Sequence, residues 1–133
     1  MSNREEKLSL LSEMITFSIV DGKLHTKEYD FILLIACELQ IDKLCFDGLF
    51  HNEIKPLQIQ SEVNRIQQFY RLALLMRVDG VLHQKEAIAI HEIGIKMGLN
   101  PKAMDVVLDL MNKSAFTVID PETLFSVFES QHN

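Results

Sequence analysis

The sequence predicts an all-α fold of about seven helices in a single bundle-like domain, and three observations support this. Apolar residues recur at spacings of three and four along several segments, which is the period of an amphipathic helix. Only five Gly and three Pro interrupt 133 residues, so long helices are favoured over a turn-rich sheet. The segment VDGKLHTKE at 20–28 returns as VDGVLHQKE at 78–86 with seven of nine residues identical. Such a repeat indicates two copies of one helical unit.

The two copies organise a single domain that covers residues 1–133. Copy one spans about 8–50 and copy two about 60–112, with a polar, proline-containing linker at 51–58. A further helix is expected at about 121–130. Each copy reads as helix, Asp-Gly turn, helix and short helix, which leaves one apolar face open. Pairing two such units about a pseudo-twofold axis would close a core.

Each expected helix carries a start or stop signal. The first (about 4–20) and fourth (about 60–77) end at Asp-Gly, because glycine readily takes the left-handed conformation after a helix. N-cap residues begin the later helices, and these starts lie near Thr26, after Asp42, near 84, at Asn100-Pro101 and at Asp120-Pro121. The apolar residues expected to face the core include Ile19, Leu44, Val63 and Ile88.

Composition excludes several classes of function. The formal net charge is −6, and no Lys/Arg-rich stripe exists to displace phosphate counterions, so a nucleic-acid partner is not expected. Cys37 and Cys45 lie in apolar runs without CxxC spacing, which favours buried free thiols and a reducing compartment. The charged segment 1–11 lacks the apolar core that is typical of a signal peptide, so none is expected, and no run of 18 apolar residues predicts a transmembrane helix. We therefore expect a cytoplasmic protein.

The duplicated motif has a purely structural interpretation. His25 and His83 would be N-cap residues, and Glu28 and Glu86 three positions later would complete a capping box. A carboxylate there also favours the positive end of the helix dipole. An EF-hand is excluded, because the front half of the loop would place the apolar Phe17 at a calcium-ligand position.

A second interpretation is a divalent-ion site. Asp, His and Glu recur in both copies, and imidazole with carboxylate is a ligand set that suits Zn²⁺ or a similar ion. The candidates are Asp21, Glu28, Asp79 and Glu86, with His25 and His83 as further ligands. No nucleophile motif or phosphate-binding loop accompanies them, so no catalytic or cofactor-binding residue is assigned.

The pattern resembles the repeated element of the tellurite-resistance TerB family, over about residues 8–112. The matching residues are Asp21, Gly22, Leu24 and Glu28, and again Asp79, Gly80, Leu82 and Glu86. His25 and His83 depart from it, since the family usually has Ser, Thr or an acid there. The resemblance implies seven helices, a role in stress response or membrane-associated assemblies, and divalent-cation binding by Asp21, Glu28, Asp79 and Glu86.

These observations predict a non-enzymatic, TerB-like module that binds a partner protein, with a divalent cation as a further expectation. The first alternative is a metal-dependent hydrolase that uses His25, His83 and the acidic residues. The second is a structural subunit that only associates with itself. The sequence does not specify an oligomeric state.

Overall fold

The computed structural model describes residues 3–20, 22–51, 57–78, 84–113 and 119–131. Within these ranges the chain is all-α and has no strand, as predicted. The seven helices are α1 (Asn3–Ser18), α2 (Thr26–Glu38), α3 (Lys43–Gly48), α4 (Glu62–Arg77), α5 (Gln84–Lys96), α6 (Pro101–Asn112) and α7 (Pro121–Ser130). None of these helices has the length and apolar character needed to cross a bilayer.

Side-chain caps explain where several helices begin. Asp42 Oδ1 accepts the Cys45 N–H at 2.8 Å before α3, and Asp120 Oδ1 accepts the Thr123 N–H at 2.9 Å before α7. Asn100 Oδ1 accepts two N–H groups of the first turn of α6, while its Nδ2 donates to the Gln131 carbonyl at 2.9 Å. These bonds satisfy donors that have no partner within the helix. Asn100 also ties the start of α6 to the end of α7.

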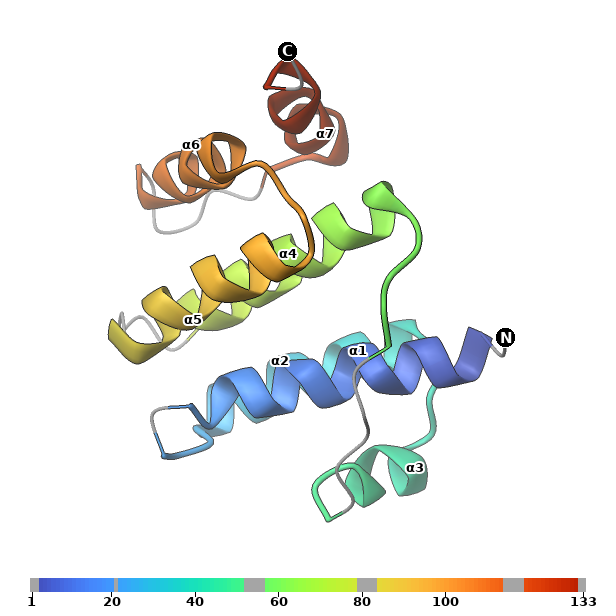
Figure 1. Cartoon of the computed structure of the whole chain (residues 1–133). Helices are drawn as coiled ribbons and strands as arrows, with labels where there is room; N and C mark the ends of the chain where they lie inside the picture. Colours follow the sequence, from blue (N-terminus) through green and yellow to red (C-terminus); the bar gives the residue numbers. More distant parts are fainter. Residues whose placement is uncertain (1–2, 21, 52–56, 79–83, 114–118, 132–133) are drawn as a thin grey trace.

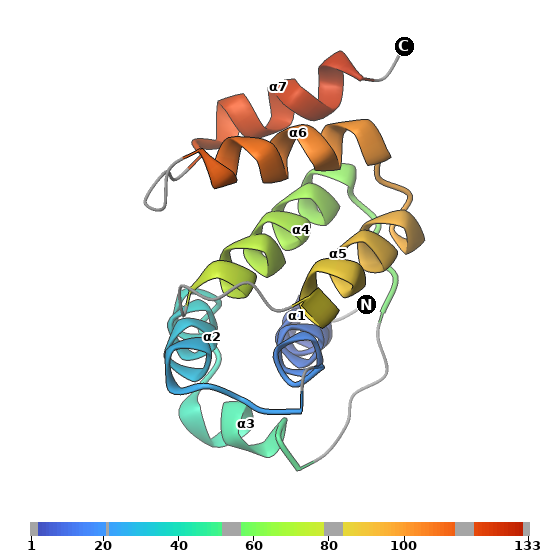
Figure 2. The same ribbon diagram turned by 90° about the vertical axis from the view of Figure 1, so that its left-hand side faces the viewer.

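The helices form three stacked layers, each built mainly from two consecutive helices (Figures 1 and 2). One layer holds α1 and α2 with α3 beneath them, α4 and α5 form the middle layer, and α6 and α7 form the layer at the C-terminal end. Helix α4 is central, because it packs against α1, α2, α5 and α7. Its side chains Phe69, Leu72, Ala73 and Leu75 have no exposed surface. Burial of one such large side chain contributes about 1.5–3 kcal/mol.

The two sequence copies have matching local structure. Helices α2 and α5 are both 13 residues long and begin at equivalent motif positions. Gln40 and Gly98, equivalent residues after these helices, have φ of 62° and 80°. Ile32 and Ile90 are both fully buried. The local match agrees with the duplication, while the pseudo-twofold relation between the copies stays a prediction.

Several residues that helical periodicity predicted to face the core are exposed in the structure. Leu44, the second residue of the short α3, is 85% exposed. Ile88 is 55% exposed because it lies on the face of α5 opposite the buried Glu86 and Ile90. Exposure of Ile19 and Val63 was likewise not expected; Ile19 lies beyond the end of α1 and Val63 is in the first turn of α4.

The cysteines are free, as expected, but the predicted burial is wrong. Cys37 is exposed and Cys45 is half-buried. Cys37 lies at the end of α2 next to the buried Ala36, so it occupies the outward face of that helix. The Arg4 guanidinium donates to Cys45 Sγ at 2.7 Å, which connects α1 to α3.

Candidate functional site

In the first motif copy, Glu28 caps the start of α2. Its carboxylate Oε1 accepts the backbone N–H of His25, the N-cap residue, at 3.1 Å. Glu28 is only 1% exposed, and the preceding Gly22 has a φ of 98° that favours glycine. The expected capping role of Glu28 is therefore confirmed.

The second motif copy is described only in part. Glu86, the equivalent of Glu28, lies in the first turn of α5 and has no exposed surface. Asp79 and His83 lie outside the described residues, as does Asp21 of the first copy. Three of the six candidate metal ligands therefore have no position here.

Cation binding at the duplicated motif is neither supported nor contradicted by the described half of the ligand set. Glu28 and Glu86 begin helices that belong to different layers (Figure 1). Among the residues with described positions, no three His, Cys, Asp or Glu side chains form a group suited to a metal ion. Cation binding, and the metal-dependent hydrolase that would use His25 and His83, stay predictions.

A large cavity lies elsewhere among the described residues, in an open groove of about 590 Å³ between α1 and α5. Figure 2 shows α5 above α1, with α4 beside them. One wall is a stripe at helical spacing, formed by Ser9, Glu13 and Thr16 of α1 and by Val20 just beyond its end. The other wall comes from α5 and includes Ala89, Ile93 and Lys96, and the segment 57–59 closes one end. We call this cavity the α1–α5 groove.

The α1–α5 groove has a mostly apolar lining that includes Leu10, Phe17 and Ile93. Two apolar residues of this lining reach the solvent: Val20 is 40% exposed and Leu57 is 37% exposed. A concave, largely apolar surface with a few polar groups is typical of binding sites.

One carboxylate lies in this apolar lining. Glu13 is partly buried, and its Oε1 accepts the Gln68 Nε2–H at 3.0 Å. Burial raises the pKa of Glu13, because it removes water from the charged form, and the Gln68 hydrogen bond lowers it in part.

Gln68 itself is fully buried and holds Glu13 from the side of α4. Its Nε2 also donates to the Leu10 carbonyl at 3.1 Å, and its Oε1 accepts from Arg71 at 3.4 Å. A buried amide with both its donors and its acceptor used has a fixed orientation. Glu13 is therefore positioned by packed structure and not by a mobile surface side chain.

Basic residues lie at one end of the groove. The Arg65 guanidinium donates to three backbone carbonyls, those of Met97 at 3.0 Å, Gln60 at 3.3 Å and Ser61 at 3.5 Å. Lys96 is exposed in the last turn of α5. The groove therefore combines a central acid with a basic end.

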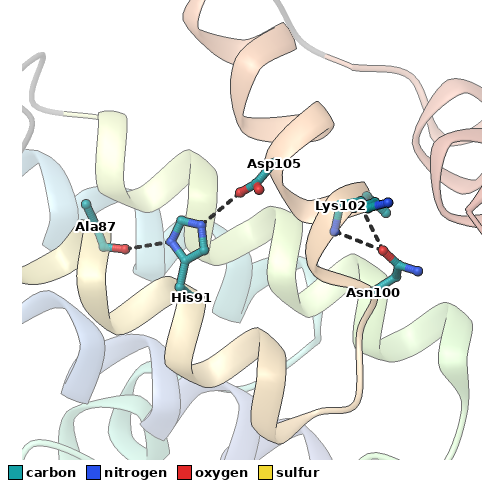
Figure 3. Close-up of polar contacts among 6 residues, drawn as sticks. Ala87, His91, Asn100, Lys102 and Asp105 are labelled. Carbon is teal, nitrogen blue, oxygen red and sulfur yellow. Dashed lines mark hydrogen bonds and ion pairs between the residues drawn. The ribbon is translucent and has the colours of Figure 1, made fainter.

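A second polar cluster joins α5 to α6 around His91. Figure 3 shows the His91 ring between the Ala87 carbonyl, 3.1 Å from Nδ1, and Asp105 Oδ1, 3.0 Å from Nε2. Both neighbours are acceptors, so the ring satisfies both only when each nitrogen carries a proton. The Asp105 hydrogen bond, then the one to Ala87, raises the pKa of His91.

Sequence reasoning identified neither Glu13 nor the His91–Asp105 pair. Glu13 was one acidic residue in a helix, and Gln68, which bonds its carboxylate, is 55 positions away. His91 and Asp105 are 14 positions apart and lie outside the duplicated nine-residue motif. One available signal was the α1 stripe of small and polar residues, Ser9, Ser12 and Thr16, where a core-facing helix normally has large apolar ones.

No protein-family model, curated protein or solved structure matches this chain.

Proposed function

We propose that this chain is a non-enzymatic, TerB-like helical module that binds a partner protein in the α1–α5 groove. The observation that carries the proposal is the groove itself: an open, mostly apolar cavity of about 590 Å³ with a positioned carboxylate, Glu13. Exposed apolar surface is costly in water unless a partner covers it.

Two polar groups outside the groove have structural roles, which is compatible with a binding module. Both ring nitrogens of His91 are engaged by neighbours, the Ala87 carbonyl and Asp105, in the contact between α5 and α6. Glu28 uses its carboxylate to cap α2. The proposal keeps a divalent cation at Asp21, Glu28, Asp79 and Glu86, a cytoplasmic location and peripheral contact with membrane assemblies as expectations of the TerB resemblance.

Site-specific photo-crosslinking tests the proposal. Thr16, exposed in the groove, is replaced by p-benzoylphenylalanine, and exposed Ser126 on α7 is replaced in a matched control. We expect irradiation of cells that make the protein to give an adduct with a second protein from position 16 and not from position 126. Absence of any position-16 adduct would refute the proposal. An adduct only with another copy of the chain would instead establish the self-association alternative.

A further inference from the structure

If the α1–α5 groove is the partner site, as the proposed function has it, its shape and charge determine what kind of partner segment fits. Two properties of the groove determine which segment fits: the geometry of its walls and the place of Glu13, the acid that Gln68 holds in the lining. The stripe that forms one wall runs from Ser9 of α1 to Val20 just beyond its end, where helical hydrogen bonds continue from the Ile19 and Val20 N–H groups. At 1.5 Å per helical residue, this wall is about 16 Å long, or about three helical turns.

An extended partner segment fits this groove poorly. The walls are helices, and the described residues contain no strand whose edge could pair with an added strand. An extended chain in a mostly apolar groove would leave backbone N–H and C=O groups without partners, which is unfavourable. A helix satisfies these groups internally, so a helical segment with one apolar face is the favoured form.

Glu13 selects the residue at the centre of that face, because the basic residues of the lining, Arg65 and Lys96, lie at one end of the groove. Glu13 lies in the lining between Leu10 and Phe17, and Gln68 fixes its position. Gln68 binds Oε1, and a carboxylate with its two oxygens accepts more bonds than this one. A purely apolar segment would bury the carboxylate further without compensation, whereas a cationic side chain would pair with it.

We propose that the α1–α5 groove binds an amphipathic helical segment of a partner protein, about three turns long, whose apolar face carries one Lys or Arg that pairs with Glu13. The net charge of −6 also favours a basic segment over an acidic one.

Two other occupants fit less well. A second copy packed groove to groove about a twofold axis would bring its own Glu13 towards the first, which places like charges together. An anionic membrane surface is repelled by the net charge of −6, and a flat surface does not fill a concave groove. Both remain outcomes that the experiment below detects.

The first test is selection from a library of displayed 14-residue peptides. Leu is fixed at four positions with helical spacing, and all other positions are random. The targets are the wild-type chain, Glu13→Gln, and the control Glu92→Gln, which removes an exposed carboxylate on α5 outside the groove. We expect Lys or Arg to be enriched at one position with wild type and Glu92→Gln, and this enrichment to be lost with Glu13→Gln.

The second test measures the charge pair directly by calorimetry with the best peptide. Replacing its basic residue by Gln is expected to weaken binding to wild type about tenfold and to change binding to Glu13→Gln little. This double-mutant cycle isolates the pair from the apolar contacts. Two separate variants localise the binding site: Ala89→Trp places a large side chain in the groove, and Ile88→Trp is the control, because Ile88 does not line the groove. Only Ala89→Trp should block the peptide, and circular dichroism verifies folding of every variant.

Each contrary outcome has a defined meaning. Enrichment of apolar peptides without a basic preference would overturn the charge pair and leave groove binding intact. A failure to enrich any peptide would overturn the proposal that a helical segment binds in the groove. The proposed function is tested independently by the crosslinking at Thr16. Sedimentation that shows a dimer which Ala89→Trp dissociates would assign the groove to a second copy. Binding of the chain to anionic vesicles, abolished by Ala89→Trp, would assign it to a membrane.

Discussion

Replacing Glu28 by alanine removes the cap of α2 and is expected to destabilise the protein by about 2–3 kcal/mol. The His25 N–H, now bonded to Glu28 at 3.1 Å, would lose its acceptor in a site where the carboxylate is 1% exposed. An unsatisfied buried donor costs about 1–3 kcal/mol, and losing a negative charge at the helix N-terminus costs about 0.3–1 kcal/mol more. Glu28→Gln keeps an oxygen acceptor, so a loss of about 0.5–1 kcal/mol is expected from the charge alone.

The assay is urea denaturation followed by circular dichroism, with unchanged m-values taken to mean that only stability has changed. Glu122→Ala is the control, because this exposed acid in the first turn of α7 interacts with a helix dipole without a buried bond; its loss should stay below about 1 kcal/mol. A Glu28→Ala variant as stable as wild type would refute the capping account. So would EDTA lowering wild type to the level of Glu28→Ala, since the carboxylate would then act through a metal.

Two further predictions concern the α5–α6 contact. The pKa of His91 is raised in the folded protein, so its bond to Asp105 should stabilise the protein fully below about pH 6.5 and less as the pH rises through the folded pKa. Urea denaturation of wild type and Asp105→Asn across pH measures this contribution. The difference in unfolding free energy should stay below about 1 kcal/mol, because the pair is half exposed. Gly94→Ala should destabilise by about 1 kcal/mol, because its new Cβ would collide with Met104 Sδ. Gly48→Ala meets no atom within 4 Å and should be neutral or stabilising by up to about 1 kcal/mol in the same denaturation assay.

Contrary results would be informative for both. A stability difference that grows as pH rises would mean that the neutral His91 ring, and not the imidazolium, makes the contact. Gly94→Ala more stable than Gly48→Ala would mean that Met104, although fully buried, moves aside at little cost. The close approach of α5 and α6 would then not depend on glycine.

Local features of the fold were predictable because their causes lie within a few residues. Asp42, Asn100 and Asp120 are N-cap residues, and the helices after them begin where these side chains bond the first-turn N–H groups. The link between His25 and Glu28 spans three positions. Such signals act inside one turn of helix, so a single sequence contains them.

Burial was less predictable, because it depends on which face of a helix meets its neighbours. Ile88 and Ile90 are equally apolar, yet one is 55% exposed and the other fully buried. Cys37 sits in an apolar run and is nevertheless exposed. The helical period narrows the choice of face, and packing between distant segments decides it.

The groove was not predictable for the same reason. The groove forms where α1 and α5 face each other. The carboxylate of Glu13 is held there by a hydrogen bond from Gln68, which is on neither wall. The duplicated motif was predicted to be a site because it repeats. Its described part shows a structural role, since Glu28 caps the start of α2.

The proposed partner site is the α1–α5 groove and not the duplicated motif. The most direct test is an NMR titration of the isotopically labelled chain with the segment recovered by crosslinking at position 16 or by peptide selection. We expect the largest amide shifts along the groove, at Thr16, Ala89 and Lys96. Shifts concentrated at Lys23–His25, and abolished by a chelator, would contradict the claim and return the function to the duplicated motif.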